Sequence, residues 1–201
     1  MNITFKNKLW RFAYDKEVTL EIIAALFKAN FNLKNGISHM LIDDLVQYLF
    51  YIDMNNLIET SSIVTGLSYY FNKEGKLRSG ELYQLIDSDN KGLFTVYTNM
   101  YNRYIIKMTN IDSIGTDNLC VYTEELISNV YYRNISNKVL AFLDLDFDEI
   151  FNTSTVVKRN LRHHIKYITL DYLVDVLELD REGVIENLSL HNVGRLNKLI
   201  N

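Results

Sequence analysis

The chain has 201 residues, of which 48% are hydrophobic, and a net charge of −4 at pH 7. This length and apolar content allow a substantial buried core, which argues against a disordered protein. The negative charge disfavours a general nucleic-acid-coating role, and no uninterrupted apolar run is long enough to span a membrane. The first residues lack the apolar stretch of a secretory signal, and the lone Cys120 cannot form an internal disulfide, so we expect a cytoplasmic protein.

No stretch of the sequence has the composition of an interdomain linker. It contains no Pro/Gly/Ser-rich interval, low-complexity tract or internal repeat. The glycines are isolated and lack the spacing of a phosphate-binding loop. We therefore predict one domain over residues 1–201, of the α+β class and predominantly helical, with a small β-hairpin or sheet. Its C-terminal helical part is expected over about residues 153–201.

Two helices are predicted near the N-terminus. Apolar residues recur at helical spacing from Glu17 to about Asn30, and Asn35-Gly36 is a strong turn signal. Ser38 can then cap a second amphipathic helix, which we expect to end near Glu59.

The next segment is rich in β-branched and aromatic residues and predicts a strand over residues 63–71. Gly66 inside it indicates a bulge or a close approach of two backbones. The pattern further predicts a turn over 72–76, a short helix over 79–87, a hairpin over 93–108, a helical region beyond 117, and helix from 156 nearly to the end.

Three segments resemble one known family. Residues 36–57 read GISHMLIDDLVQYLFYIDMNNL, residues 61–70 read SSIVTGLSYY, and residues 80–87 read GELYQLID. They are similar to the Panacea domain family, in which a helix ends in a Leu-Leu-Tyr-x-Asp-like run and a Ser-Ile-Thr-Gly-x-x-Tyr element follows. The matching positions here are Leu49 to Asp53 for the run and Ser62, Ile63, Thr65, Gly66 and Tyr69 for the element.

The family pattern is incomplete in two places. Its Gly-Pro pair falls at Gly75, which is not followed by proline, and Gln47 stands where the first helix usually has a basic residue. The resemblance covers residues 36–87 and implies a Panacea-like part over about residues 17–150.

The resemblance implies a function without chemistry. Panacea domains are associated with antitoxins of bacterial and phage toxin–antitoxin pairs and with other mobile-element proteins, and no cofactor or catalytic residue set carries over. The expected function is a non-catalytic, antitoxin-like or phage/mobile-element modulator that neutralises a protein partner, either a toxin or a host factor.

The expected partner surface is the turn that holds Lys73, Lys76 and Arg78, beside Tyr69 and Tyr70. Aromatic residues and arginine are favoured at binding hot spots. The alternative is that these tyrosines pack on a helix and the lysines only solvate the turn.

Metal and catalytic patterns are weak. The alternating Asp144, Asp146 and Asp148 lack the glycine and the glutamate of a calcium loop. The histidines lack zinc-site spacing, since His163 and His164 are adjacent. No serine lies in a nucleophile elbow, and no cysteine-enzyme signature surrounds Cys120. We therefore expect no enzyme activity, metal or cofactor.

DNA binding is the competing hypothesis. Residues 169–188 have the outline of a helix-turn-helix, but the segment from Arg181 to Leu188 carries two glutamates against one arginine, which phosphates would repel. A helical hairpin that closes the core is the alternative interpretation of this segment. A transcriptional regulator would use either this C-terminal hairpin or the basic residues Lys158, Arg159, Arg162 and Lys166, the last two sharing a face of a helix. The basic run can equally be a solvated helix or dock on the acidic segment 144–149.

Overall fold

The computed structural model describes residues 14–33, 39–61, 63–72, 74, 76–89, 91–111, 114–115, 119, 121–131, 166–167, 174 and 177–184. The main elements are, in order, α1 (Lys16–Leu33), β1 (His39–Leu41), α2 (Ile42–Thr60), β2 (Tyr69–Phe71), β3 (Leu77–Ser79), α3 (Gly80–Asp87), β4 (Phe94–Thr98), β5 (Tyr104–Met108), α4 (Val121–Tyr131) and β6 (Lys166–Tyr167). Helical residues outnumber strand residues among those described, which confirms the predicted mainly helical α+β class. Within this part of the chain, no helix has the length and apolar character that a membrane span requires.

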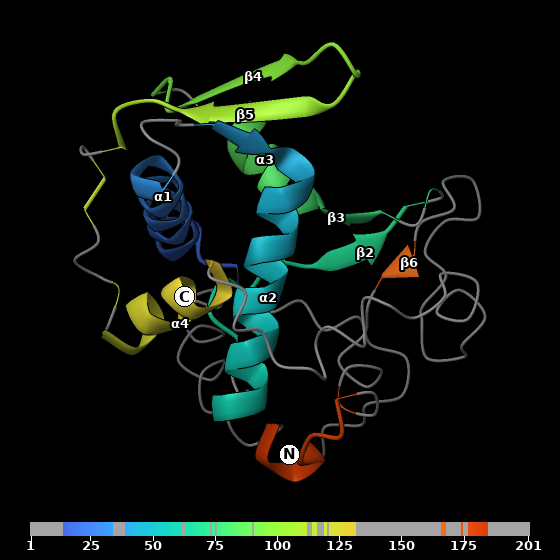
Figure 1. Cartoon of the computed structure of the whole chain (residues 1–201). Helices are drawn as coiled ribbons and strands as arrows, with labels where there is room; N and C mark the ends of the chain where they lie inside the picture. Colours follow the sequence, from blue (N-terminus) through green and yellow to red (C-terminus); the bar gives the residue numbers. More distant parts are fainter. Residues whose placement is uncertain are drawn as a thin grey trace, which may run out of the picture.

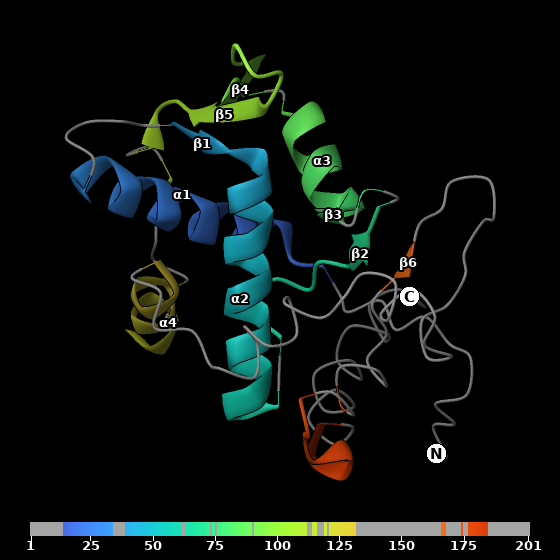
Figure 2. The ribbon, with the colours of Figure 1, turned by 45° about the vertical axis from the view of Figure 1, so that its right-hand side comes forward.

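Helix α2 is the centre of the fold (Figure 1). Helices α1 and α4 lie on one side of it and strands β2 and β3 on the other, and a second view shows the same arrangement (Figure 2). Every residue of α2 from Ile52 to Leu57 is buried, as expected for a helix surrounded by other elements. Asn55 and Asn56 are therefore buried although they are polar.

Two small antiparallel sheets flank this helix. One has the strand order β1-β5-β4 and the other β3-β2-β6. In the first sheet, Ile106 lies between Met40 of β1 and Val96 of β4. Ile106 and Met40 are buried, so this face of the sheet packs on the core, and β4 forms an outer edge of the sheet.

A buried amide joins three elements that are distant in sequence. The Asn30 side chain in α1 donates to the His39 carbonyl in β1 at 3.0 Å and accepts from the Tyr131 hydroxyl in α4 at 2.9 Å. Because both ends of the amide are hydrogen-bonded, its burial carries no large desolvation penalty.

The described C-terminal residues also belong to the core. Val174, Leu177 and Val184 are buried in the same apolar cluster as α1 and α2. The Asp180 carboxylate accepts the backbone N–H groups of residues 182 and 183 and thereby caps the short helix over 181–184. These contacts agree with a hairpin that closes the core.

Most predicted elements are present, with four corrections. The second helix begins at Ile42 instead of directly after a Ser38 cap, because residues 39–41 pair with β5 as strand β1. The predicted strand over 63–71 is reduced to Tyr69–Phe71. Strand β3 was not predicted, and strand β6 interrupts the stretch predicted to be helical from residue 156. The helix over 79–87 and the hairpin over 93–108 are confirmed.

Candidate functional site

The first candidate site is a buried carboxylate in α2. Asp53 has no exposed surface and accepts four hydrogen bonds, all from the segment of residues 64–69. The donors are the backbone N–H of Val64 at 3.1 Å, the backbone N–H of Thr65 at 2.8 Å, the Thr65 hydroxyl, and the Tyr69 hydroxyl at 2.8 Å. This set of contacts fastens the segment to the middle of the fold.

Thr65 connects this carboxylate to a second helix. Its carbonyl accepts the backbone N–H of Asp15 at 3.1 Å, and Asp15 caps the start of α1 by accepting the N–H groups of Glu17 and Val18. The Thr65 hydroxyl also accepts the Leu67 N–H at 3.1 Å. Gly66 follows at φ 71°, a left-handed conformation that favours glycine. The glycine therefore serves a left-handed backbone turn, whereas the sequence predicted a bulge or a close approach of two backbones.

We call Asp53 together with its donors in Val64, Thr65 and Tyr69 the Asp53 node. Burial has the largest effect on the pKa values of Asp53 and Tyr69 in this node. It raises the pKa of Asp53 from 3.8 to about 6, and the hydrogen bonds from Thr65, Tyr69 and Val64 oppose that rise by stabilising the ionised form. Burial and the neighbouring Asp53 charge raise the pKa of Tyr69 well above its ordinary value. Tyr69 is thus a neutral donor, and Asp53, with no exposed surface, positions the segment and does not contact a ligand.

The residues of the predicted partner surface divide between two faces. Tyr69 is buried, so its assignment to a partner surface is corrected: its hydroxyl is held by Asp53 and its ring packs edge-on against Phe50 at 5.1 Å. Tyr70 points to the other side of β2, is half-buried, and lies opposite Arg78 of β3. Lys73 lies outside the described residues.

The two remaining cations of that surface already have an internal partner. Asp43, in the first turn of α2, pairs with Arg78 at 2.9 Å and with Lys76 at 3.6 Å. The Arg78 side chain is only 15% exposed, whereas the Lys76 side chain is 54% exposed. Of this group, Lys76 and Tyr70 retain surface for a partner, while Arg78 mainly holds the β2–β3 hairpin against α2.

The basic residues of the DNA-binding hypothesis lie mostly outside the described part of the chain. This holds for Lys158, Arg159 and Arg162. Lys166 is described and lies in strand β6, paired with Phe71. The argument that it shares a helix face with Arg162 is therefore wrong, because the backbone at Lys166 is extended. DNA binding itself stays a prediction.

The metal candidates are equally limited. Residues 144–148, Cys120 and three of the four histidines lie outside the described residues. His39 is exposed in β1. Among the residues described, no group of three or more His, Cys, Asp or Glu side chains could hold a metal ion.

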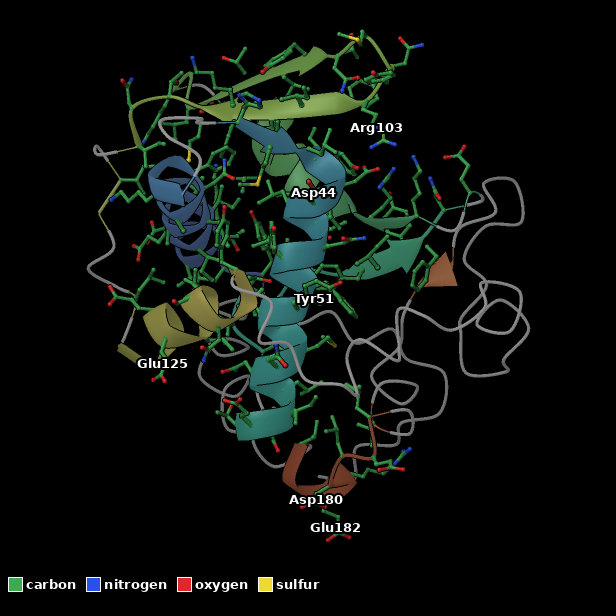
Figure 3. The ribbon with its side chains drawn as sticks, viewed as in Figure 1. Asp44, Tyr51, Arg103, Glu125, Asp180 and Glu182 are labelled. Carbon is green, nitrogen blue, oxygen red and sulfur yellow. The ribbon has the colours of Figure 1, made fainter. Side chains whose placement is uncertain are left out.

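A second candidate site, which the sequence did not identify, is the β4–β5 hairpin. The described residues contain five exposed large hydrophobic side chains, and all of them lie here: Val96 and Tyr97 at 42%, Tyr104 at 63%, Tyr101 at 75% and Met100 at 87%. The hairpin lies along the top of the molecule in Figure 3, which shows Arg103 near its turn end. A hint in the sequence was the near-continuous run of aromatic and β-branched residues on both sides of the turn.

Asp53 and its donors join two of the segments on which the expected resemblance to the Panacea family rests. Asp53 is the last residue of the run that begins at Leu49, and Thr65 and Tyr69 belong to the element of residues 62–69. Residues from these two sequence patterns are therefore hydrogen-bonded to each other. No protein-family model, curated protein sequence or solved structure matches this chain.

Proposed function

We propose that this chain is a non-catalytic protein-binding module, an antitoxin-like or phage/mobile-element modulator that neutralises a partner protein. The observation that carries the proposal is the concentration of exposed apolar side chains on the β4–β5 hairpin. Large exposed apolar side chains gathered on one element indicate an interaction site in a soluble protein, and tyrosine and methionine are enriched in protein interfaces. The resemblance of residues 36–87 to the Panacea family points to the same class of function.

The buried carboxylate supports binding over catalysis. Burial raises the pKa of Asp53 to about 6, which would make it a candidate for acid–base chemistry. Its oxygens are occupied by donors from residues 64–69, and a general acid or base must reach a substrate proton. The node instead fixes the β2 end of the domain beside α2.

The partly exposed Tyr70 and Lys76 form a smaller, polar surface on the β2–β3 hairpin. Interfaces combine an apolar centre with a polar rim. We propose the β4–β5 hairpin as the main contact and the β2–β3 hairpin as a peripheral one.

Affinity purification of the full chain from its native cells, with nuclease treatment, tests this function. The expected result is one protein at fixed stoichiometry that binds the purified chain in isothermal titration calorimetry. Binding should weaken at least about tenfold in a Tyr101→Ser/Met100→Ser variant, since truncation of central anchors costs 1.4 kcal/mol or more. An Asp87→Asn variant, changed at an exposed position of α3, is the matched control.

Two outcomes contradict the proposal. One is retention that nuclease abolishes, which would favour the DNA-binding alternative. The other is a purified partner whose affinity is the same for the hairpin variant and for the control.

A further inference from the structure

We infer that the free edge of β4 accepts an extended segment of the partner protein as an additional antiparallel strand, with apolar and acidic side chains alternating along that segment. The inference rests on the proposed protein-binding function and specifies how the partner is held. It concerns the backbone edge of the hairpin as well as its side chains.

The hydrogen-bond register shows which backbone groups point outward. Leu93 accepts from the Thr109 N–H at 2.8 Å, and the Asn99 N–H donates to Arg103 at 3.0 Å, so the odd-numbered residues of β4 face β5. In an antiparallel pair the intervening residues direct their N–H and C=O groups to the opposite side. The backbone groups of Val96 and Thr98 therefore point to the open edge.

One end of this edge is closed and the other is open. The outward N–H of Phe94 donates to the Asp89 carboxylate at 2.7 Å, which confirms the direction and caps the beginning of the strand. For Val96 and Thr98, the described residues provide no such cap. This arrangement leaves room for an added strand beside the distal half of β4.

The edge also lacks the usual protection against strand addition. Natural edge strands carry lysine, proline, a bulge or an inward-pointing charge. Strand β4 reads FTVYT, without charge or proline, and four of its five residues are exposed. These residue types have high strand propensity, so the edge is ready to pair with another extended chain.

The two faces of the sheet differ in what they would contact. Val96 lies opposite the buried Ile106, yet is 42% exposed, so the apolar inner face extends past the core. On the outer face, Lys107 lies between Thr95 and the exposed His39. An added strand would place every second side chain on each face, apolar residues beside Val96 and acidic residues on the Lys107 side.

Charge indicates the chemistry of the partner. Residues 91–111 contain Lys91, Arg103 and Lys107 and no acidic residue, although the whole chain has a net charge of −4. Lys91, Arg103 and Lys107 are exposed, and none of them forms an ion pair with another of the described residues. A second copy would bring like charges together, whereas an acidic segment complements them.

The aliphatic Val96 and the open backbone favour a peptide over nucleic acid, which binds by stacking and phosphate contacts.

Random peptides displayed on phage and selected on the full-length protein provide the test. The expected result is enrichment of sequences that alternate apolar and acidic residues. A synthetic version of each peptide has two sets of alternate backbone amides, and only one set can face the edge of β4. N-methylation of that set should reduce the affinity at least about tenfold, whereas N-methylation of the other set should reduce it little. No other binding mode predicts that dependence on register.

Matched variants locate the site. Val96→Pro removes the outward N–H without removing a bond to β5 and should weaken the peptides at least about tenfold, whereas Val96→Thr keeps the N–H and should not. Lys107→Glu should reduce affinity for the acidic peptides and leave neutral alternating peptides unchanged. Urea unfolding of each variant checks the fold, and the N-methylated peptides test the inference even if Val96→Pro does not fold.

Several results would overturn the inference: no enrichment of peptides, enrichment of basic or non-alternating ones, or equal affinity for both registers of N-methylation. Dimerisation of the wild type that Val96→Pro abolishes would assign the edge to a second copy. Binding of single-stranded oligonucleotides that Arg103→Glu abolishes would assign it to nucleic acid. If the purified native partner binds Val96→Pro as tightly as the wild type, strand addition fails while the protein-binding function stands.

Discussion

Residues 63–71 and the β4–β5 hairpin are similar in composition and opposite in environment. Both are rich in tyrosine and β-branched residues. In the first segment Thr65 and Tyr69 are buried, whereas Tyr101 and Tyr104 of the hairpin are exposed. The local sequence does not explain this difference in burial. Helix α2 supplies a buried acceptor, Asp53, to the first segment.

The comparison shows what allows a polar strand-forming segment to be buried. An unpaired hydroxyl or amide in the core costs about 1–3 kcal/mol, so each buried donor needs a partner. Asp53 satisfies four donors at once. Hairpin tyrosines keep their hydroxyls in water and leave their rings available for a partner.

The largest expected effect comes from removing the shared acceptor. Asp53→Asn replaces one accepting oxygen by an amide that cannot accept, so at least two donors lose a partner. We expect the free energy of unfolding to fall by about 3–5 kcal/mol. Urea unfolding measures the loss, and the exposed Asp87→Asn should change stability by less than about 0.5 kcal/mol. Similar stability of both variants would show that the node is not structural.

A smaller effect is expected from pH. The pKa of Asp53 in the folded protein is about 6, above its ordinary value of 3.8, so the folded state binds this proton more tightly than the unfolded state. The contribution of Asp53 to stability is therefore largest at low pH and is lost as pH rises through 6. Relative to Asp53→Asn, the wild type should gain about 2–3 kcal/mol between pH 7 and pH 4. A constant difference across this range would show that Asp53 remains ionised.

The third prediction compares a buried and an exposed tyrosine directly. Tyr69→Phe removes one hydrogen bond to a charged acceptor and should reduce the free energy of unfolding by about 1–2 kcal/mol. The same substitution at the exposed Tyr97 should leave it within about 0.5 kcal/mol. Equal changes, measured by thermal and urea unfolding, would remove the distinction between the two regions.

The smallest expected effect concerns the polar surface between them. Asp43→Asn removes the carboxylate that pairs with Arg78 and Lys76. Because these groups are partly exposed, the expected loss is about 0.5–1 kcal/mol and should shrink at high salt. A double-mutant cycle with Arg78→Gln measures the pair. A coupling energy near zero at low salt would show that Asp43 does not hold the β2–β3 hairpin.

The long periodic elements could be predicted from the sequence, and the short paired ones could not. Helices α1 and α2 and the β4–β5 hairpin have apolar patterns that can be recognised within a short stretch of the sequence. Strands β1 and β3 have only three residues each, and β1 exists because it pairs with β5, far along the chain. No local pattern contains that information.

The candidate sites show the same limit. The resemblance grouped Asp53 with Thr65 and Tyr69, but only coordinates could show that they share hydrogen bonds. The prediction that Tyr69 faces a partner failed because alternation along β2 sends Tyr69 and Tyr70 to opposite sides, and the sequence does not tell which side is covered. Exposure at the hairpin depends on how far its strands extend past the core, which residue types do not specify.

The hydrogen bond from the Asp15 N–H to the Thr65 carbonyl has a kinetic consequence. It joins the first turn of α1 to a loop that itself depends on α2, so this loop cannot close until both helices have docked. A contact between such distant parts of the chain forms late in folding and opens only when the whole domain opens. The amide protons of Asp15 and Thr65 should therefore be protected from deuterium exchange up to the free energy of global unfolding, while those of Val96 and Thr98 exchange freely.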